Sequence, residues 1–221
     1  MALIRFHKEG YSWIAGAVGI GLIGAVLLWW LRPALWLSLS LGILWMAGTL
    51  FILNFFRYPQ RVCPADPNLI YAPCDGRVVE VCPTFEPKYF HREMLQVSIF
   101  MSPLDVHVNW APAGGILRAL DHNHGTYLVA WHPKASLLNE QTFLAVEGKE
   151  ASHSYAIRQI AGVFARRIRT YPTVGASLEA GEEIGFIKFG SRVDVLLPLT
   201  VQVKVQPGDK VTGALTPIAH W

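Results

Sequence analysis

Two long apolar runs dominate the first quarter of the chain. The run from Trp13 to Leu31 has 19 residues without a charge, and the run from Ala34 to Phe56 has 23. An α-helix rises about 1.5 Å per residue, so either run reaches across a hydrocarbon core of about 30 Å. Arg32 and Pro33 separate the runs. The pattern predicts a transmembrane helical hairpin over residues 1–56. The alternative is one spanning helix followed by a helix that lies in the membrane interface.

The charges that flank the two runs predict the orientation of this hairpin. Arg5 and Lys8 precede the first run, Arg57 and Arg61 follow the second, and the turn carries only Arg32. Positive residues favour the cytoplasmic side of a membrane. We therefore expect a cell-membrane protein whose two hairpin ends, and all residues that follow them, are cytoplasmic.

The hydrophobic pattern changes after the second run. Short apolar and β-branched runs now alternate with turn-forming Gly, Pro and Asp residues, which is typical of strands. The predicted strands are 76–81, 95–101, 116–120, 142–146, 154–160, 183–188, 193–197 and 201–205. One helix is expected, over 162–169. The fold class is therefore mainly β, with a barrel-sandwich-like domain in residues 57–221. Residues 72–81 and 203–213 also resemble the paired half-motifs of biotinyl and lipoyl carrier domains, which concerns architecture rather than function.

Composition narrows the function classes. The chain is 52% hydrophobic and 16% charged, which excludes disorder for most of its length. Its three cysteines form no CxxC pair, so neither a disulfide framework nor a metal site is expected. Residues 57–221 hold 16 cations and 15 acids. A nearly neutral domain does not predict a nucleic-acid partner.

Three side chains could carry chemistry. Ser191 follows Gly190 between two apolar runs, His107 lies in a segment framed by two prolines, and Asp75 lies in a turn that enters a strand. A serine, a histidine and an aspartate can form an activated nucleophile. A serine hydrolase is disfavoured because no Gly-x-Ser-x-Gly motif surrounds Ser191. A Gly-Ser step by itself usually marks only a tight turn.

Several ordered motifs give these residues a common context. The motifs are Phe55-Phe-Arg-Tyr-Pro-Gln-Arg61, Ala72-Pro-Cys-Asp-Gly76, Phe100-Met-Ser-Pro-Leu-Asp-Val-His107, Asn139-Glu140, Ile160-Ala-Gly-Val-Phe-Ala-Arg-Arg-Ile168 and Gly185-Phe-Ile-Lys-Phe-Gly-Ser-Arg192. Together they resemble the short, archaeal-type form of the phosphatidylserine decarboxylase proenzyme, from about residue 55 to the C-terminus.

This resemblance implies a mechanism. The precursor would cut itself between Gly190 and Ser191, leaving chains 1–190 and 191–221 associated and turning Ser191 into a covalent pyruvoyl cofactor. That group would form a Schiff base with the membrane phospholipid phosphatidylserine, which loses CO2 and yields phosphatidylethanolamine. His107 would be the base or proton donor, and Asp75 would orient it.

One departure from the family concerns the second histidine. Longer members carry it three positions after the first, where this sequence has Trp110. His107 therefore has to serve both stages, or His122 or His124 takes part. Asp105 could instead cap the local backbone.

The segment 151–178 contains four arginines and no acid. Within it, Arg166 and Arg167 are candidates for contact with anionic lipid headgroups, because arginine suits bidentate phosphate binding. The alternative is a solvated basic face. The alternative for the whole chain is a membrane-anchored barrel-sandwich adaptor without catalysis, and a homo-oligomer is compatible with either function.

Overall fold

The computed structural model describes residues 5–64, 66–125, 139–162, 167–188 and 191–221. The chain divides into two compact units, residues 1–59 and 60–221. The division falls three residues after the expected boundary at 56/57.

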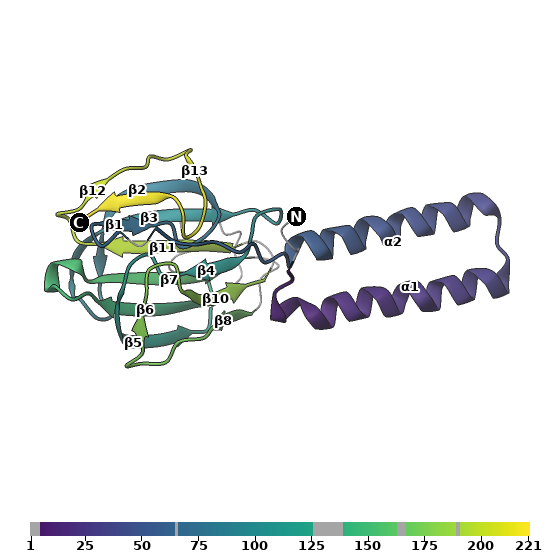
Figure 1. The fold of residues 1–221 in the computed structure, drawn as a ribbon, viewed down its shortest axis with the longest axis horizontal. Helices are drawn as coiled ribbons and strands as arrows, with labels where there is room; N and C mark the ends of the chain where they lie inside the picture. The colour runs from purple at the N-terminus through teal and green to yellow at the C-terminus, as the bar shows by residue number, and fades with distance from the viewer. Residues whose placement is uncertain (1–4, 65, 126–138, 163–166, 189–190) are drawn as a thin grey trace. The chain divides into compact units, whose positions relative to one another are not determined.

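The first unit is a helical hairpin. A short 3-10 helix, η1 (Lys8–Gly10), leads into α1 (Tyr11–Leu31), and α2 (Leu35–Phe55) returns antiparallel to it (Figure 1). Arg32 ends α1 in the left-handed region at φ 46°, and Pro33, which cannot continue a helix, follows it. Both helices are long and apolar enough to cross a membrane by length and composition. The predicted pair of helices is thus confirmed.

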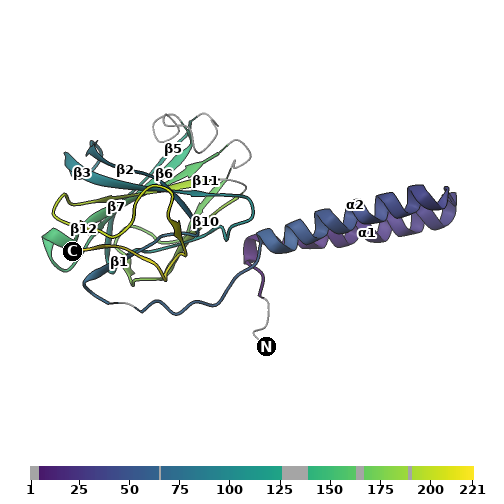
Figure 2. The ribbon, with the colours of Figure 1, turned by 90° about the horizontal axis from the view of Figure 1, so that it is seen from above.

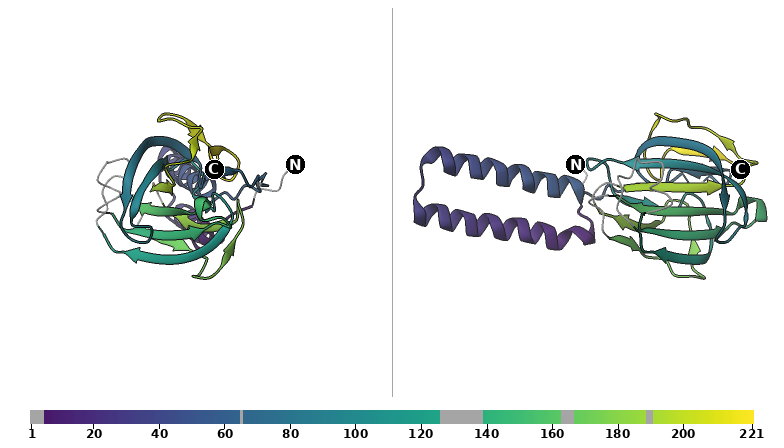
Figure 3. Two further views of the ribbon diagram at one scale, coloured as in Figure 1. Left: turned by 90° about the vertical axis from the view of Figure 1, so that its left-hand side faces the viewer. Right: turned by 180° about the vertical axis from the view of Figure 1, so that it is seen from behind.

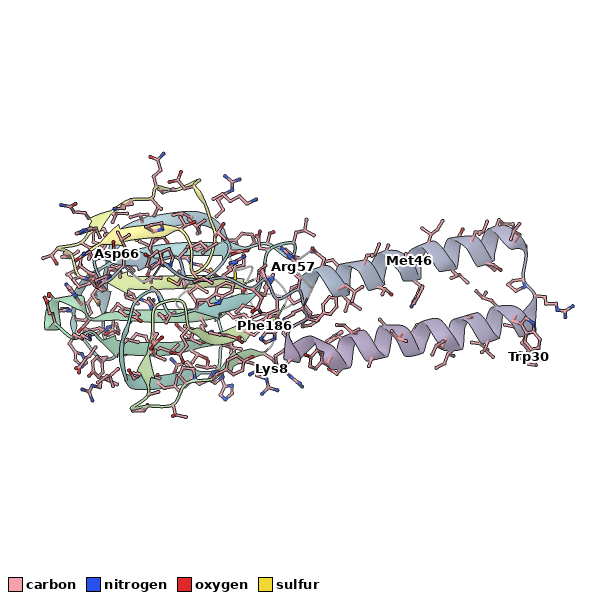
Figure 4. All side chains as sticks on the ribbon, in the orientation of Figure 1. Lys8, Trp30, Met46, Arg57, Asp66 and Phe186 are labelled. Carbon is pink, nitrogen blue, oxygen red and sulfur yellow. The ribbon has the colours of Figure 1, made fainter. Side chains whose placement is uncertain are left out.

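Contacts within the hairpin join its helices and its ends. The indole nitrogen of Trp45 on α2 donates to the Ala17 carbonyl of α1 at 2.9 Å. Phe6 pairs with Arg57 as an isolated β-bridge, so the chain enters and leaves the hairpin side by side. Most other side chains of α1 and α2 point outward as apolar sticks, and the labelled Lys8 and Arg57 lie at the end opposite Trp30 (Figure 4).

The second unit is built from fourteen described strands. They are β1 (Leu69–Tyr71), β2 (Gly76–Glu86), β3 (Arg92–Met101), β4 (Val108–Trp110), β5 (Gly115–Asn123), β6 (Gln141–Glu147), β7 (Tyr155–Ala161), β8 (Ile168–Thr170), β9 (Ser177–Leu178), β10 (Glu183–Ile187), β11 (Ser191–Leu197), β12 (Gln202–Val203), β13 (Lys210–Val211) and β14 (Pro217–His220). A short 3-10 helix, η2 (Ala151–His153), precedes β7. The predicted fold class, mainly β and barrel-like, is confirmed.

Three sheets enclose the core. The largest has the order β13-β2-β3-β11-β7-β6-β5-β9 and curls into a half-barrel (Figure 3). Two three-stranded sheets, β4-β10-β8 and β1-β14-β12, complete the unit (Figure 2). The main apolar cluster takes residues from the large sheet and from both small ones, for example Val193, Ile184 and Ile218. The core therefore lies between the curled sheet and the two small sheets.

The other face of the large sheet has a smaller apolar cluster. Met94, Phe143, Ala145, Ala156 and Leu196 form it. The turn at residues 87–91, between β2 and β3, packs Tyr89 and Phe90 against this cluster. The carboxylate of Glu86 accepts the backbone N–H groups of residues 88, 89 and 90 and so closes the turn.

Two sequence expectations meet the structure at particular strands. The helix predicted over 162–169 is wrong at its C-terminal end, because Ile168–Thr170 is strand β8, hydrogen-bonded to β10; residues 163–166 lie outside the described residues. The two stretches that resemble carrier half-motifs do meet, since β13 pairs with the start of β2 through Lys210 opposite Arg77.

Candidate active site

One edge of the large sheet gathers the motifs found in the sequence. Ser191, the first residue of β11, lies opposite Met101 at the end of β3 and opposite Ala161 at the end of β7. One residue further into the sheet, Arg192 pairs with Phe100, which also pairs with Arg77 of β2. Segments distant in sequence therefore converge at this edge, because β2, β3, β11 and β7 pair antiparallel and their register is nearly unbroken.

Gly76 allows β2 to begin beside β3. Its φ is +152°, and a Cβ atom there would collide with the backbone oxygen of Phe100. Only glycine fits this close approach without strain. The glycine of the Asp75-Gly76 step thus explains how Asp75 is brought to the same edge as Ser191.

Ser191 is fully buried, and its hydroxyl oxygen has no hydrogen-bond partner among the described residues. Its neighbours two, four and six positions on, Val193, Val195 and Leu197, belong to the main core cluster, so the Ser191 side chain faces the interior. An unsatisfied buried hydroxyl costs about 1–3 kcal/mol. Such a group is expected where function requires it. Gly190, the predicted acyl side of the cut, lies outside the described residues.

His107 is buried in the segment between β3 and β4. Its Nδ1 lies 3.0 Å from the backbone oxygen of Asp105. A carbonyl oxygen has no proton to give, so a neutral ring that makes this hydrogen bond has its proton on Nδ1 and its lone pair on Nε2. The carbonyl of His107 accepts from the N–H of Ile187 at 3.3 Å. This bond ties the histidine to the strand that leads toward Ser191.

Asp105 caps the turn before His107, as the alternative interpretation of the sequence has it. Its Oδ2 accepts the backbone N–H of Ser102 at 2.8 Å, and its own N–H donates to the carbonyl of Ser102 at 2.9 Å. These two bonds fix the backbone from which His107 projects.

Asp75 is bound by partners that the sequence analysis did not assign. Arg61 donates to both carboxylate oxygens, at 2.5 and 2.8 Å, and the N–H of Gly213 donates to Oδ1 at 2.8 Å. The hydrogen bonds of Asp75 thus go to Arg61 and Gly213, while Nδ1 of His107 faces Asp105. The orienting contact expected between Asp75 and His107 is not among them.

Trp110 belongs to the same group. Its ring lies under the guanidinium of Arg61, 4.7 Å from centroid to Cζ, and Arg61 also donates to the Gly213 carbonyl. At the position where longer family members have a second histidine, this chain therefore places an aromatic face that supports the cation paired with Asp75. In the sequence, Arg61 is visible only as a cation that flanks the second apolar run and as the last residue of the Phe55–Arg61 motif, and neither signal predicts its contact with Asp75.

Cys74 precedes Asp75 and is fully buried. Burial, with the nearby Asp75 carboxylate as the next cause, raises the pKa of its thiol well above the usual value. The thiol therefore stays protonated and unreactive at neutral pH.

Arg192 faces away from Ser191 into a polar cluster on the other side of the sheet. It is 2% exposed and donates to Asp194 at 2.6 Å, to Glu80 at 2.8 Å and to Ser98 at 2.6 Å. Burial acts to lower the pKa of Arg192, but the charge of Asp194 and the hydrogen bonds to Asp194 and Glu80 together raise it above its usual value. The cluster holds β11 firmly one residue after Ser191.

Asn139 and Glu140 hold the end of β7. The Asn139 amide donates to the carbonyl of Ala161 at 2.7 Å, and the Ala161 N–H donates to the carbonyl of Glu140 at 2.9 Å. Ala161 is the register partner of Ser191. This motif thus supports the strand beside the candidate nucleophile.

The histidine and arginine alternatives lie as follows. His122 contacts the hydroxyl of Thr142 through Nδ1 at 3.0 Å and lies 3.6 Å from Glu140 through Nε2. The His124 ring packs edge-on to that of His122. Arg167 is exposed, and Arg166 lies outside the described residues. Arg158 is buried on β7, so the four arginines of the 151–178 segment do not share one solvated face.

Comparison with known proteins identifies the family. A family model described as phosphatidylserine decarboxylase matches residues 49–219. A phosphatidylserine decarboxylase proenzyme of Amoebophilus asiaticus is 42% identical over 218 residues, 98% of this chain and 96% of the relative. A proenzyme of that name from Cytophaga hutchinsonii is 39% identical and covers 99% of this chain and 99% of the relative. A proenzyme of that name from Cupriavidus pinatubonensis is also 39% identical and covers 96% of this chain and 94% of the relative.

Proposed function

Because this chain belongs to the phosphatidylserine decarboxylase family, we propose that it decarboxylates phosphatidylserine with a pyruvoyl group made from its own Ser191. The observation that carries this proposal is the buried hydroxyl of Ser191, which has no hydrogen-bond partner among the described residues and lies at the edge where the family's motifs converge. A pyruvoyl group supplies a ketone that condenses with the substrate amine and accepts the electron pair released when CO2 leaves.

The formation of this group uses atoms of this chain. Ser191 Oγ adds to the carbonyl carbon of residue 190 as its proton passes to a base. The C–N bond breaks, the nitrogen is protonated, and an ester forms. Removal of the Ser191 α-proton then expels Oγ with its electron pair as part of the residue 190 carboxylate. Water finally replaces the nitrogen, which leaves as ammonia.

His107 is the base in this proposal. Its Nε2 has the lone pair because Nδ1 donates to Asp105, and the bond from Ile187 ties it to the segment before the cut. For Asp75, which the sequence predicts to be catalytic, we propose a role in holding the two chains together. Asp75, paired with Arg61, joins the start of β2 to Gly213, which belongs to the smaller chain after scission.

The hairpin would place this chemistry at a membrane. We propose that α1 and α2 both span it, with the second unit on the cytoplasmic side, and that Arg166 and Arg167 bind anionic headgroups. The exposed position of Arg167 is compatible with such contact.

Intact-mass measurement and denaturing electrophoresis of the purified full-length protein test the proposal. We expect two chains, with the smaller one starting at position 191 and blocked by a carbonyl that hydroxylamine traps. Ser191→Ala should stay uncut and inactive. Ser154→Ala should be cut normally. Ser154 is another buried serine, and it directly precedes the first residue of β7, at the end of that strand away from Ser191. Active protein with a continuous backbone at 190–191 would contradict the mechanism.

A further inference from the structure

A hydrogen-bonded chain of three polar side chains crosses the interior near Ser191. Thr170 Oγ1 lies 2.8 Å from Gln159 Oε1, and Gln159 Nε2 lies 2.7 Å from Asn109 Oδ1. Asn109 Nδ2 ends the chain, 3.8 Å from the sulfur of Met101. Asn109 and Gln159 are fully buried. The chain runs from β8 through β7 to β4 and so links the curled sheet to the small sheet β4-β10-β8.

The direction of this chain is fixed by the chemistry of its end. A thioether sulfur has no hydrogen to donate, so the Asn109 atom that faces it must be the amide nitrogen. Oδ1 of Asn109 is then the acceptor, Gln159 must donate to it, and Gln159 Oε1 accepts from Thr170. Both amides are therefore held in one orientation, with the donor end of Asn109 directed at Met101.

Met101 connects this donor to Ser191. The two residues are direct register partners of β3 and β11. Cβ atoms of such pairs lie about 4.5–5.5 Å apart on the same face of a sheet. A thioether is only a weak acceptor, and Ser191 Oγ has no partner among the described residues. Among the described residues, the Asn109 amide nitrogen thus has only a weak acceptor and Ser191 Oγ has no donor, and both residues adjoin the Met101 side chain.

A glycine of the Gly185–Arg192 motif makes room for the chain. Gly185 is the register partner of Asn109 on β10, and a Cβ atom there would lie 2.6 Å from Gln159 Nε2. The same Cβ atom would collide with the backbone oxygen of Arg169, so a larger residue would disturb both strand β8 and the Gln159 amide. The motif that contains the cut thus also protects the orientation of Asn109.

We propose that Asn109 is the hydrogen-bond donor to Ser191 Oγ during self-cleavage, and that Gln159, which bonds to it directly, is its positioning residue. This inference rests on the proposed function. Oγ carries negative charge at two stages: when the base removes its proton before the attack on residue 190, and when it leaves Cβ with its electron pair. An aimed amide N–H stabilises both stages. The unbranched, flexible side chain of Met101 can move aside to let the contact form.

Asn109→Asp tests this role in the full-length chain. The substitution keeps an oxygen that accepts from Gln159, replaces the donor, and adds an ionisable carboxyl group. Newly synthesised, pulse-labelled precursor is followed by electrophoresis, and thermal melting of the detergent-purified protein is measured in parallel. We expect scission to slow about 100-fold, as when one oxyanion donor is removed from an enzyme. Thr170→Val, the matched control at the far end of the chain, should slow scission less than threefold.

Gln159→Met is the second variant, for use where an aspartate at 109 prevents folding. It removes the bond that orients Asn109 without adding a charge, and it should slow scission at least tenfold. Wild-type scission rates in both Asn109→Asp and Gln159→Met would overturn the inference. Slowing that matches Thr170→Val at equal loss of melting temperature would also overturn it. A wild-type chain that never splits would instead overturn the proposed function itself.

Discussion

Neighbouring residues at the start of β11 have opposite environments. Ser191 faces the core with a hydroxyl that no described residue hydrogen-bonds, while Arg192 faces the other side of the sheet with three hydrogen bonds. Alternation along a strand separates the two. The reactive group can therefore remain unsatisfied because the residue beside it anchors the strand.

Arg192→Met should destabilise the fold strongly, because it leaves the fully buried Asp194 without its cation. Removing one partner of a buried ion pair costs about 3–5 kcal/mol. Urea unfolding of the uncut Ser191→Ala protein measures this cost without interference from scission. Glu80→Gln is the control and should cost much less, because the Glu80 side chain is 41% exposed. Equal costs would contradict the assigned anchoring role.

Arg61→Met should loosen the attachment of the smaller chain. Arg61 and Asp75 both bind Gly213, and their side chains are only 10% and 15% exposed. Loss of the pair should cost about 2–3 kcal/mol, below the range for complete burial. In cleaved protein, the small chain should then dissociate at lower urea concentration in size-exclusion chromatography. Arg61→Lys cannot form the bidentate contact and should fall between the wild type and Arg61→Met.

The individual residues show what a sequence can predict of a site and what it cannot. Ser191 and His107 were found through motifs. The partner of Asp75 was not, because the pairing depends on how residues 61, 75, 110 and 213 meet in space. Asn109 lacked any local signal, since its role depends on a register partner and on a side chain from another sheet.

At the scale of elements, strand prediction succeeded where apolar alternation is long. The strands predicted at 95–101 and 142–146 lie within β3 and β6. Three-residue strands such as β4 and β8 were not predicted. Three residues are too few to show the apolar–polar alternation of a strand, so these strands are defined only by their pairing in the fold. The register that places Ser191 beside Met101 is likewise a property of the pairing.

The turn at residues 87–91 should detach reversibly in acid. Hydrogen bonds from Lys88 to Asp121, and from Tyr89 and Arg118 to Glu147, lower the pKa values of these two carboxylates. A lowered pKa in the folded state contributes stability that is present above the unfolded value of about 4 and is lost as pH falls below it. Hydrogen exchange at residues 88–90 should therefore accelerate below about pH 4.

The same turn should also loosen in alkali. Burial and the hydrogen bond to Glu147 raise the pKa of Tyr89. A raised pKa gives stability that is lost as pH rises through the folded value, which lies above about 10. Tyr89→Phe should abolish the alkaline limb and retain the acid one. An unchanged exchange profile in that variant would refute the assignment.

At the scale of the whole molecule, the two units differ sharply in surface chemistry. The hairpin exposes large apolar side chains along both helices, and the second unit is nearly neutral. Such extensive exposed apolar surface is typical of a site that contacts a membrane or another protein.

Reporter fusions test the resulting topology. Green fluorescent protein joined after Trp221 should be fluorescent, and alkaline phosphatase joined there should be inactive, because the cations that flank the hairpin ends predict that these ends are cytoplasmic. Alkaline phosphatase inserted at the Arg32-Pro33 turn should be active. Inactivity at the turn would instead favour a second helix that lies in the interface.

The position of β11 in the middle of the large sheet has a consequence for how the protein matures. The strand lies between β3 and β7, and both neighbours belong to the segment before the proposed cut. A peptide of residues 191–221 supplied afterwards would have to insert β11 between two strands in the middle of the sheet. Folding of the precursor would therefore have to precede the proposed cut, so only a correctly folded copy would become active. Misfolded precursors would stay uncut and inactive. A damaged small chain could not be replaced by one from another molecule.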